Sequence, residues 1–195
     1  MGRGLPIVKW LLAALLLTAL FLAAAGSQTA YADGKGSQFG VLYGLSVPDA
    51  QNTNTFRMMG FKGQAFILPT LSAGGYFLQT DKSGQQSLTN KFSYSLTGIE
   101  SAYHIPTGSG DTFIGMRVGM TKLLSTGGGN DLIFSPYHYG LTTGYDYYLG
   151  TYLSIGFEGS YLHVQPGRTA DAAGIEYNKD SFNVINFLVA VQFHL

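Results

Sequence analysis

The four histidines are the first residues to consider for chemistry, because an imidazole can bind a metal or act as a general base. His104, His138, His163 and His194 lie far apart and share no spacing typical of a metal site. A glycine-rich run at 125–131 contains no Lys followed by Ser or Thr, which argues against a phosphate-binding loop. The chain has no cysteine, which excludes disulfides and thiolate chemistry. We therefore predict no metal site and no cofactor.

A second set of polar residues is expected to meet through strand pairing. Antiparallel pairing about the intervening loops places Arg117 beside His138, His138 near Glu158, and Glu158 near Asn186. Lys62 falls on the same face of its own segment. We predict that these five residues form one buried polar cluster. Buried charges need partners, and Arg with Glu is a strong pair, so the cluster is interpreted as a structural plug. The alternative is a gated pore that this pair opens and closes.

The segments that carry these residues alternate between apolar and small polar side chains. A period of two predicts β-strands with two different faces, and no stretch after residue 33 has a convincing helical period. The apolar face of one of these segments is assigned to Phe92, Tyr94 and Leu96. The predicted strands, eight in all, are 39–47, 59–67, 73–80, 92–97, 114–121, 137–146, 153–161 and 185–195.

Long and short connections also alternate along the chain, as expected for an up-and-down meander. The short connections lie near 69–72, 106–111 and 147–151. The long connections are 48–57, 81–90, 123–132 and 165–180.

The composition of the two faces indicates what each face meets. Only 11% of the chain is charged, against about 25% in ordinary soluble domains. Within the strand centres, Lys62, Arg117 and Glu158 all fall on the small polar face, which suits a narrow barrel interior. The apolar face then meets lipid, so the fold class is all-β, an eight-stranded antiparallel transmembrane β-barrel. Because hydrocarbon tolerates no open sheet edge, the first strand must pair with the last.

Two further features test this arrangement. Glu100 shares the apolar face of its strand, so we predict a bulge near Gly98 that returns it to the lumen. The alternative places Glu100 near the membrane interface, where a charge costs about 0–1 kcal/mol. Tyrosines are expected at both membrane borders. Those near the short turns are Tyr103, Tyr147, Tyr148 and Tyr152, and those near the long loops are Tyr137, Tyr139 and Tyr161.

Residues 1–32 have the composition of a secretory signal peptide. Arg3 and Lys9 precede an apolar run from Trp10 to Ala25, and Ala30-Tyr31-Ala32 supplies a small-x-small cleavage pattern. The run is shorter than the roughly 20 residues that a transmembrane helix needs. We predict removal of this segment before Asp33, which leaves a single barrel domain at 33–195.

With its signal peptide, eight strands, short turns and long loops, the chain resembles the small Gram-negative outer-membrane β-barrels of the outer-membrane protein A type. The resemblance implies the cell outer membrane, contact with its lipid and lipopolysaccharide, and help from periplasmic chaperones and the barrel-assembly machinery. That machinery reads a C-terminal pattern, matched here by Phe187, Val189, Val191 and Phe193. Leu195 stands where members usually have Phe.

We predict a structural or surface-interaction role with at most a narrow, porin-like pore, and no enzymatic activity. The chain has zero net charge and so lacks the excess of basic residues that nucleic-acid-binding proteins use, which argues against a nucleic-acid partner. One alternative is a lipid A-modifying barrel enzyme, but the His-x-Ser-Asn pattern of the deacylases is absent around His138. Ser160 and Glu158 are close to His138 in register, on the interior face. A further alternative is a soluble periplasmic ligand-binding barrel.

Overall fold

The computed structural model describes residues 36–49, 55–81, 91–127, 130–170 and 176–195, and the regular elements in these ranges are β-strands. Within these ranges, no helix is long and apolar enough to cross a bilayer. The predicted signal segment, 1–32, lies outside the described residues. The strands are β1 (Ser37–Pro48), β2 (Phe56–Leu68), β3 (Leu71–Thr80), β4 (Lys91–Thr107), β5 (Gly110–Gly127), β6 (Asn130–Phe134), β7 (Tyr137–Tyr148), β8 (Leu153–Val164), β9 (Gly167–Ala170), β10 (Glu176–Lys179) and β11 (Phe182–His194).

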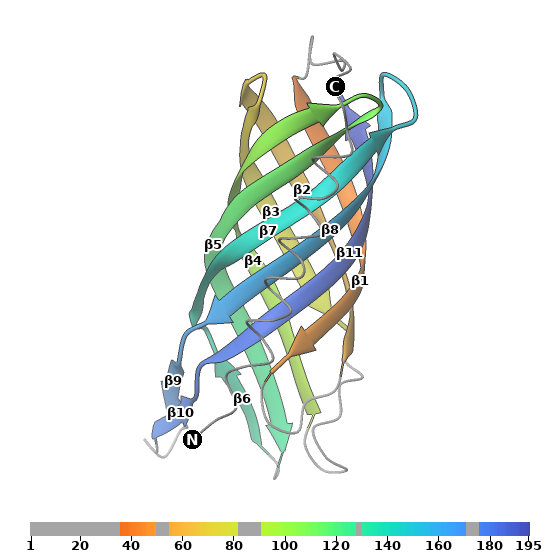
Figure 1. The fold of residues 1–195 in the computed structure, drawn as a ribbon. Helices are drawn as coiled ribbons and strands as arrows, with labels where there is room; N and C mark the ends of the chain where they lie inside the picture. Colours follow the sequence, from red (N-terminus) through yellow and green to blue (C-terminus); the bar gives the residue numbers. More distant parts are fainter. Residues whose placement is uncertain (1–35, 50–54, 82–90, 128–129, 171–175) are drawn as a thin grey trace, which may run out of the picture.

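In the described part of the chain, eight strands form a closed antiparallel barrel (Figure 1). They are β1, β2, β3, β4, β5, β7, β8 and β11, in that order around the wall. β1 pairs with β11, from Gln38 opposite His194 to Pro48 opposite Val184. This contact closes the sheet, so the predicted pairing of the first and last strands is confirmed.

The strands are staggered around the barrel. Cross-strand partners can be followed once around the barrel, from Leu153 on β8 through β11, β1, β2, β3, β4, β5 and β7. The path returns to β8 at His163, ten residues further along that strand. Such a stagger in an eight-stranded barrel requires the strands to tilt by roughly 40° from the barrel axis. Rows of cross-strand partners therefore climb the wall obliquely, from the end near Leu153 to the end near His163.

The two ends of the barrel differ. At one end, short turns join β2 to β3, β4 to β5 and β7 to β8, and Ser37 and Leu195 exchange backbone hydrogen bonds of 3.3 and 2.9 Å. At the other end, β5 and β6 form a hairpin and β9 pairs with β10 (Figure 1). The regions 123–132 and 165–180, predicted as loops, therefore carry strand structure in their described parts. We call these the turn end and the loop end.

Alternate residues face outward and form an apolar belt. On β1, β2, β5, β7, β8 and β11 these are the residues predicted to meet lipid. Phe157, Val118 and Val189 expose 63%, 51% and 43% of their surface. They do not converge on a shared core, and a belt of this kind is the exterior expected of a barrel in hydrocarbon.

Tyrosines border this belt on β7. Tyr147, near the turn end, and Tyr137, near the loop end, are both exposed and ten residues apart on one strand. At about 3.3 Å per residue and a tilt near 40°, they differ in height by about 25 Å. That equals the height of the apolar band of outer-membrane barrels. Tyr148 differs from its prediction, because its hydroxyl turns inward and donates to Asp111 (2.7 Å).

The predicted faces of β4 are wrong. Tyr94 and Leu96 are buried in the lumen, on the same face as Glu100. The register of β4 with β3 and β5 continues past Gly98 without a shift, so the predicted bulge there is also wrong. Glu100 reaches the lumen by ordinary alternation, and the interface alternative does not hold. A register shift occurs instead on β2, between residues 66 and 68.

Candidate functional site

Four charged side chains meet in the middle of the lumen. Lys62 Nζ donates to Glu158 Oε2 at 2.9 Å, and Arg117 Nη1 lies 2.7 Å from Glu158 Oε1. Arg117 Nε donates to Glu100 Oε2 at 2.5 Å. All four side chains are almost completely buried. Two cations and two anions thus form a neutral network, which we call the charged quartet.

Strand register explains part of the charged quartet. Glu100 and Arg117 are direct cross-strand partners on β4 and β5. Lys62 comes from β2 and Glu158 from β8, so these two reach their partners across the lumen. Aromatic rings flank both cations: Lys62 Nζ lies 4.6 Å from the ring centre of Phe113, and the Arg117 guanidinium lies 4.6 Å from that of Tyr76. These contacts add cation–π attraction where water is excluded.

The other two predicted cluster residues point into the lumen but bind elsewhere. His138 contacts the hydroxyl groups of Tyr76 and Thr121, the latter at 2.9 Å. Asn186 donates to Ser160 at 2.9 Å and accepts from Ser46. The structure therefore brings together Lys62, Arg117 and Glu158, and places His138 and Asn186 in separate hydrogen-bonded groups.

The predicted cross-strand neighbours are wrong in register although each residue lies on the interior face. Arg117 is opposite Gly140, two residues from His138. Glu158 is opposite Gly144 on β7 and Leu188 on β11. The error arises because the midpoint of each connection does not coincide with the centre of the hairpin. Between β7 and β8, for example, the strands continue to residues 148 and 153.

Two glutamines extend the charged quartet and were missed by the sequence analysis. Gln64 Nε2 donates to Glu100 Oε1 at 2.5 Å, and Gln38 Nε2 donates to Gln64 Oε1 at 2.6 Å. Gln64 shares the interior face with Lys62 on β2, and this alternation was a signal that could have identified it. The chain of amides continues the polar network from the charged quartet toward the turn end.

A Ser–His–Asp arrangement also lies in the lumen near the turn end. Ser72 Oγ is 2.9 Å from His104 Nε2, and His104 Nδ1 is 3.6 Å from Asp111 Oδ2. These residue types perform nucleophilic catalysis in hydrolases when the hydroxyl reaches a substrate. Here Ser72 has no exposed surface, and the His104 ring packs against Phe66 and Phe113, with centres 4.8 and 5.7 Å apart. The Ser72 hydroxyl therefore cannot reach a substrate, and we interpret the arrangement as part of the barrel interior.

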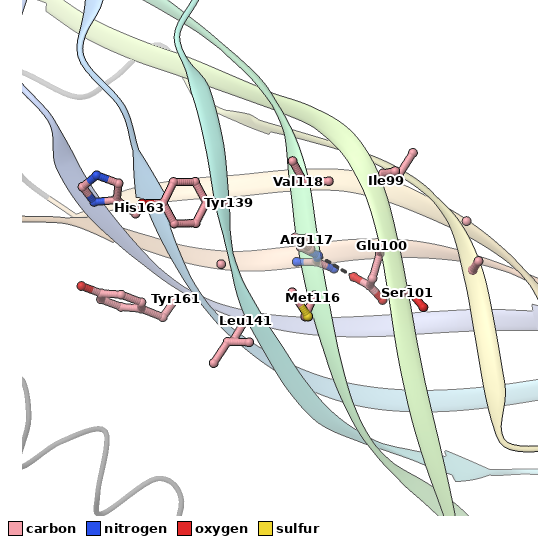
Figure 2. A pocket seen from close by; sticks show the side chains of 13 residues that line it. Ile99, Glu100, Ser101, Met116, Arg117, Val118, Tyr139, Leu141, Tyr161 and His163 are labelled. Atoms are coloured by element: carbon pink, nitrogen blue, oxygen red, sulfur yellow. Dashed lines mark hydrogen bonds and ion pairs between the residues drawn. The ribbon is translucent and has the colours of Figure 1, made fainter.

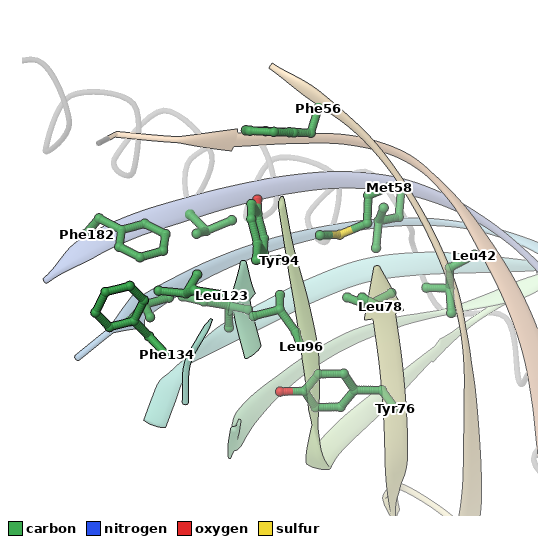
Figure 3. Packing of buried hydrophobic residues seen from close by; sticks show 14 of the residues in the cluster. Leu42, Phe56, Met58, Tyr76, Leu78, Tyr94, Leu96, Leu123, Phe134 and Phe182 are labelled. Carbon is green, nitrogen blue, oxygen red and sulfur yellow. The ribbon is translucent and has the colours of Figure 1, made fainter. Parts of the chain in front are cut away.

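Toward the loop end, the lumen is apolar rather than filled by small hydrophilic groups as predicted. Buried side chains from many strands pack against one another there (Figure 3). Aromatic contacts include Phe56 with Tyr94 and Tyr94 with Phe182, with ring centres 5.6 and 6.4 Å apart. We call this group the apolar plug; its members include Leu42, Phe56, Met58, Leu78, Tyr94, Leu96, Leu123, Phe134, Phe182 and Val184.

The interior is therefore layered, from polar networks at the turn end, through the charged quartet, to the apolar plug. In the described ranges, no three His, Asp or Glu side chains are grouped as metal ligands. On the exterior, the five residues of the predicted assembly signal all face outward: Phe187, Val189, Val191, Phe193 and Leu195.

No family model matches the sequence, and no curated protein sequence matches it. Solved structures do match. Neisserial surface protein A, NspA, superimposes with a TM-score of 0.63 at 12% identity, covering 82% of this chain and 96% of that chain. Our chain has the fold of the small outer-membrane β-barrels.

Two further structures have this outer-membrane barrel fold. Ail, the attachment invasion locus protein of Yersinia pestis, matches with a TM-score of 0.57 at 13% identity, over 83% of this chain and all of that one. The outer membrane protein OprG from Pseudomonas aeruginosa gives 0.54 at 11% identity, over 84% and 98%. None of the three is named for a catalytic activity. At these identities the likeness concerns the barrel fold alone.

Proposed function

We propose that this protein is exported to the outer membrane, where it acts as a closed barrel with a structural or surface-interaction role. The observation that carries the proposal is the combination of an apolar belt outside and a filled lumen inside. Lipid is the medium in which such a belt is stable. A lumen occupied by the charged quartet and the apolar plug leaves the extended regions at the loop end as the parts available to partners.

The filled lumen supports a structural plug rather than an open pore. Opening a path would require separation of buried ion pairs and of packed aromatic side chains, and both changes cost free energy. Conductance of the purified mature protein in planar lipid bilayers tests this. We expect no current above the lipid background, whereas stable unitary openings would contradict a closed barrel.

Orientation can be tested cleanly because the chain has no cysteine. We propose that the loop end faces outside the cell and the turn end faces the periplasm. Gln165→Cys, exposed at the loop end, should react with a membrane-impermeant maleimide on intact cells. Its control is Gly150→Cys at the turn end, where a side chain meets open space, and this variant should react only after permeabilisation. The reverse pattern would overturn the orientation.

The proposed role is non-catalytic. Ser160, expected close to His138 in register, is paired with Asn186, and Glu158 belongs to the charged quartet. Ser72 is buried beside His104, away from the lipid-facing surface where acyl chains would approach. Mass spectrometry of lipid A from cells with and without the protein tests this; an altered acyl count would favour the enzyme alternative.

A soluble periplasmic ligand-binding barrel is disfavoured by the apolar belt, because such a surface in water promotes aggregation. Membrane extraction distinguishes the two. The proposed protein should stay with washed membranes until detergent is added, whereas a soluble barrel would leave without it.

Biogenesis completes the proposal. We infer that residues 1–32 direct export and are cleaved before Asp33, and that chaperones and the barrel-assembly machinery recognise the outward-facing C-terminal residues of β11. Sequencing of the N-terminus of protein purified from membranes should give Asp33 as the first residue. Retention of Met1 would contradict the inference.

A further inference from the structure

A groove runs obliquely across the outer wall of the barrel, over β3, β4, β5, β7 and β8 (Figure 2). Its volume is about 1080 Å³. One ridge is the row of cross-strand partners Ile99, Val118, Tyr139 and His163. The other ridge is the next outward row, Ala73, Ser101, Met116, Leu141 and Tyr161.

The floor of the groove is the inward-facing row between the two ridges. It consists of Gly74, Glu100, Arg117 and Gly140, which are consecutive cross-strand partners. The two glycines have no side chain, and the side chains of Glu100 and Arg117 point into the lumen. The floor is therefore bare backbone, and the groove lies back to back with part of the charged quartet across one wall (Figure 2).

The dimensions of the groove suit one extended hydrocarbon chain. The two ridges are two residues apart along each strand, or about 7 Å. From β3 to β8 the groove crosses four strand-to-strand spacings, or about 19 Å. Because the rows climb the wall, four strand spacings at a tilt near 40° raise the groove by about 12 Å, from its β3 side at Ala73 to the loop-end border at His163. It therefore spans about one leaflet of a hydrocarbon core that is roughly 30 Å thick.

The middle of the groove and its loop-end rim differ in polarity. Ile99, Met116 and Leu141 line its middle and are strongly exposed apolar side chains. Its loop-end rim carries the phenols of Tyr139 and Tyr161 and the imidazole of His163. Such amphipathic groups are stable at the depth where acyl chains join their headgroups.

Neighbouring polar groups fix the His163 ring. Asn183 Nδ2 donates to Asp49 Oδ2 at 2.7 Å, which sets the orientation of the amide. Asn183 Oδ1 therefore faces His163 Nδ1 at 2.9 Å, and since an amide oxygen only accepts, Nδ1 carries the hydrogen. The ring also packs against Tyr139, with ring centres 5.4 Å apart. In the neutral ring Nε2 is then the acceptor, and Tyr139 and Tyr161 supply hydroxyl donors at the same rim.

We propose that this groove retains one acyl chain of an outer-leaflet lipid, with the ester or amide linkage of that chain hydrogen-bonded at the Tyr139–Tyr161–His163 rim. The inference rests on the proposed membrane location. Membrane location alone does not imply the groove, because a uniform lipid-facing wall would hold every neighbouring acyl chain equally weakly. Continuity of the groove with the apolar belt supplies the hydrocarbon, and the rim supplies the matching polar contacts.

Fluorescence quenching tests the groove. The sole tryptophan, Trp10, lies in the predicted signal segment, so the mature chain provides a dark background. Leu141→Trp places a reporter on the groove ridge, and Val189→Trp places one on β11, in the same belt but outside the groove. Each mature protein is reconstituted in bilayers of diether phosphatidylcholine, which lacks the ester carbonyl, with increasing fractions of dibrominated diester phosphatidylcholine, which quenches tryptophan on contact.

Because only the brominated lipid carries the ester that the rim binds, Leu141→Trp should quench at roughly threefold lower brominated fraction than Val189→Trp, a preference worth about one net hydrogen bond. Met116→Ala in the groove should reduce that excess, while Met59→Ala, an exposed methionine on β2, should not. Equal quenching of both reporters would overturn the groove inference and leave the membrane location intact. Quenching of neither reporter would instead refute the proposed function.

The rim is tested separately in the Leu141→Trp background. Tyr161→Phe should lower the excess quenching, because it removes a hydroxyl donor and keeps the ring. Tyr43→Phe, on β1 outside the groove, is the matched control and should leave the excess unchanged. An unchanged excess in both variants would contradict hydrogen bonding at the rim.

Discussion

Glu158→Gln tests whether the charged quartet stabilises the barrel. The change removes one carboxylate from a network of two cations and two anions. Arg117 keeps Glu100 at 2.5 Å, but Lys62 loses the carboxylate that it contacts at 2.9 Å. Loss of one partner from a fully buried pair typically costs 3–5 kcal/mol, because the other charge remains unsolvated and uncompensated. We expect a loss of about 3–5 kcal/mol in the free energy of unfolding.

The matched control restores neutrality. Lys62→Met alone leaves Glu158 in excess and should also be costly. The double variant Lys62→Met with Glu158→Gln leaves only the balanced Arg117–Glu100 pair. Since replacing a buried pair by apolar groups is often neutral, we expect the double variant to recover to within about 1–2 kcal/mol of the parent.

Equilibrium urea unfolding in lipid vesicles, followed by far-ultraviolet circular dichroism, measures all four proteins of this cycle. Strong coupling between the two sites is the expected result. If the losses of the two single variants simply add in the double variant, Lys62 and Glu158 do not act as a pair and the reasoning is refuted.

Three further changes test other parts of the structure. Phe157→Lys places a charge on the belt and should cost about 2–4 kcal/mol in bilayer unfolding, whereas Gln165→Lys at the loop end should cost less than about 1 kcal/mol; equal costs would contradict the belt. Gly144→Ala drives a methyl group into the backbone of Phe157 and should lower stability by about 1–3 kcal/mol in the same assay, while Gly159→Ala meets only the Asn186 carbonyl oxygen at 4.0 Å and should be tolerated. Leu195→Phe restores the usual aromatic C-terminus and should raise the yield of heat-modifiable folded protein in membranes; a lower yield would argue against the assembly signal.

The barrel could be predicted from the sequence because alternation is a local property that fixes which residues share a face. The assignment failed on β4 because both faces depart from the rule. Outward positions there include Ser93, Ser95 and Thr97, while Tyr94 and Leu96 point inward. Hydropathy alone therefore favoured the wrong face, and only the apolar plug contributed by other strands explains why the aromatic face is buried.

The charged quartet could be predicted only in part for a related reason. Alternation correctly placed Lys62, Arg117 and Glu158 inside, but contacts across the lumen depend on the stagger of the whole barrel. That stagger accumulates over eight strand pairs, and no local pattern encodes it. Glu100 was left out of the predicted cluster because its face of β4 was assigned to lipid. Its inward position, which follows from ordinary alternation, was therefore interpreted as a break in the pattern.

We infer that the outward belt meets lipid while a closed, filled interior lies behind it. Nuclear magnetic resonance of methyl-labelled mature protein in lipid nanodiscs tests this directly, with one paramagnetic probe on the acyl chains and another dissolved in water. The methyl groups of Val118 and Val189 should be relaxed by the lipid probe and unaffected by the aqueous probe. Those of Leu42 and Leu96, in the apolar plug, should be shielded from both probes. Relaxation of the plug methyls by the lipid probe, or insensitivity of the belt methyls to it, would contradict the account.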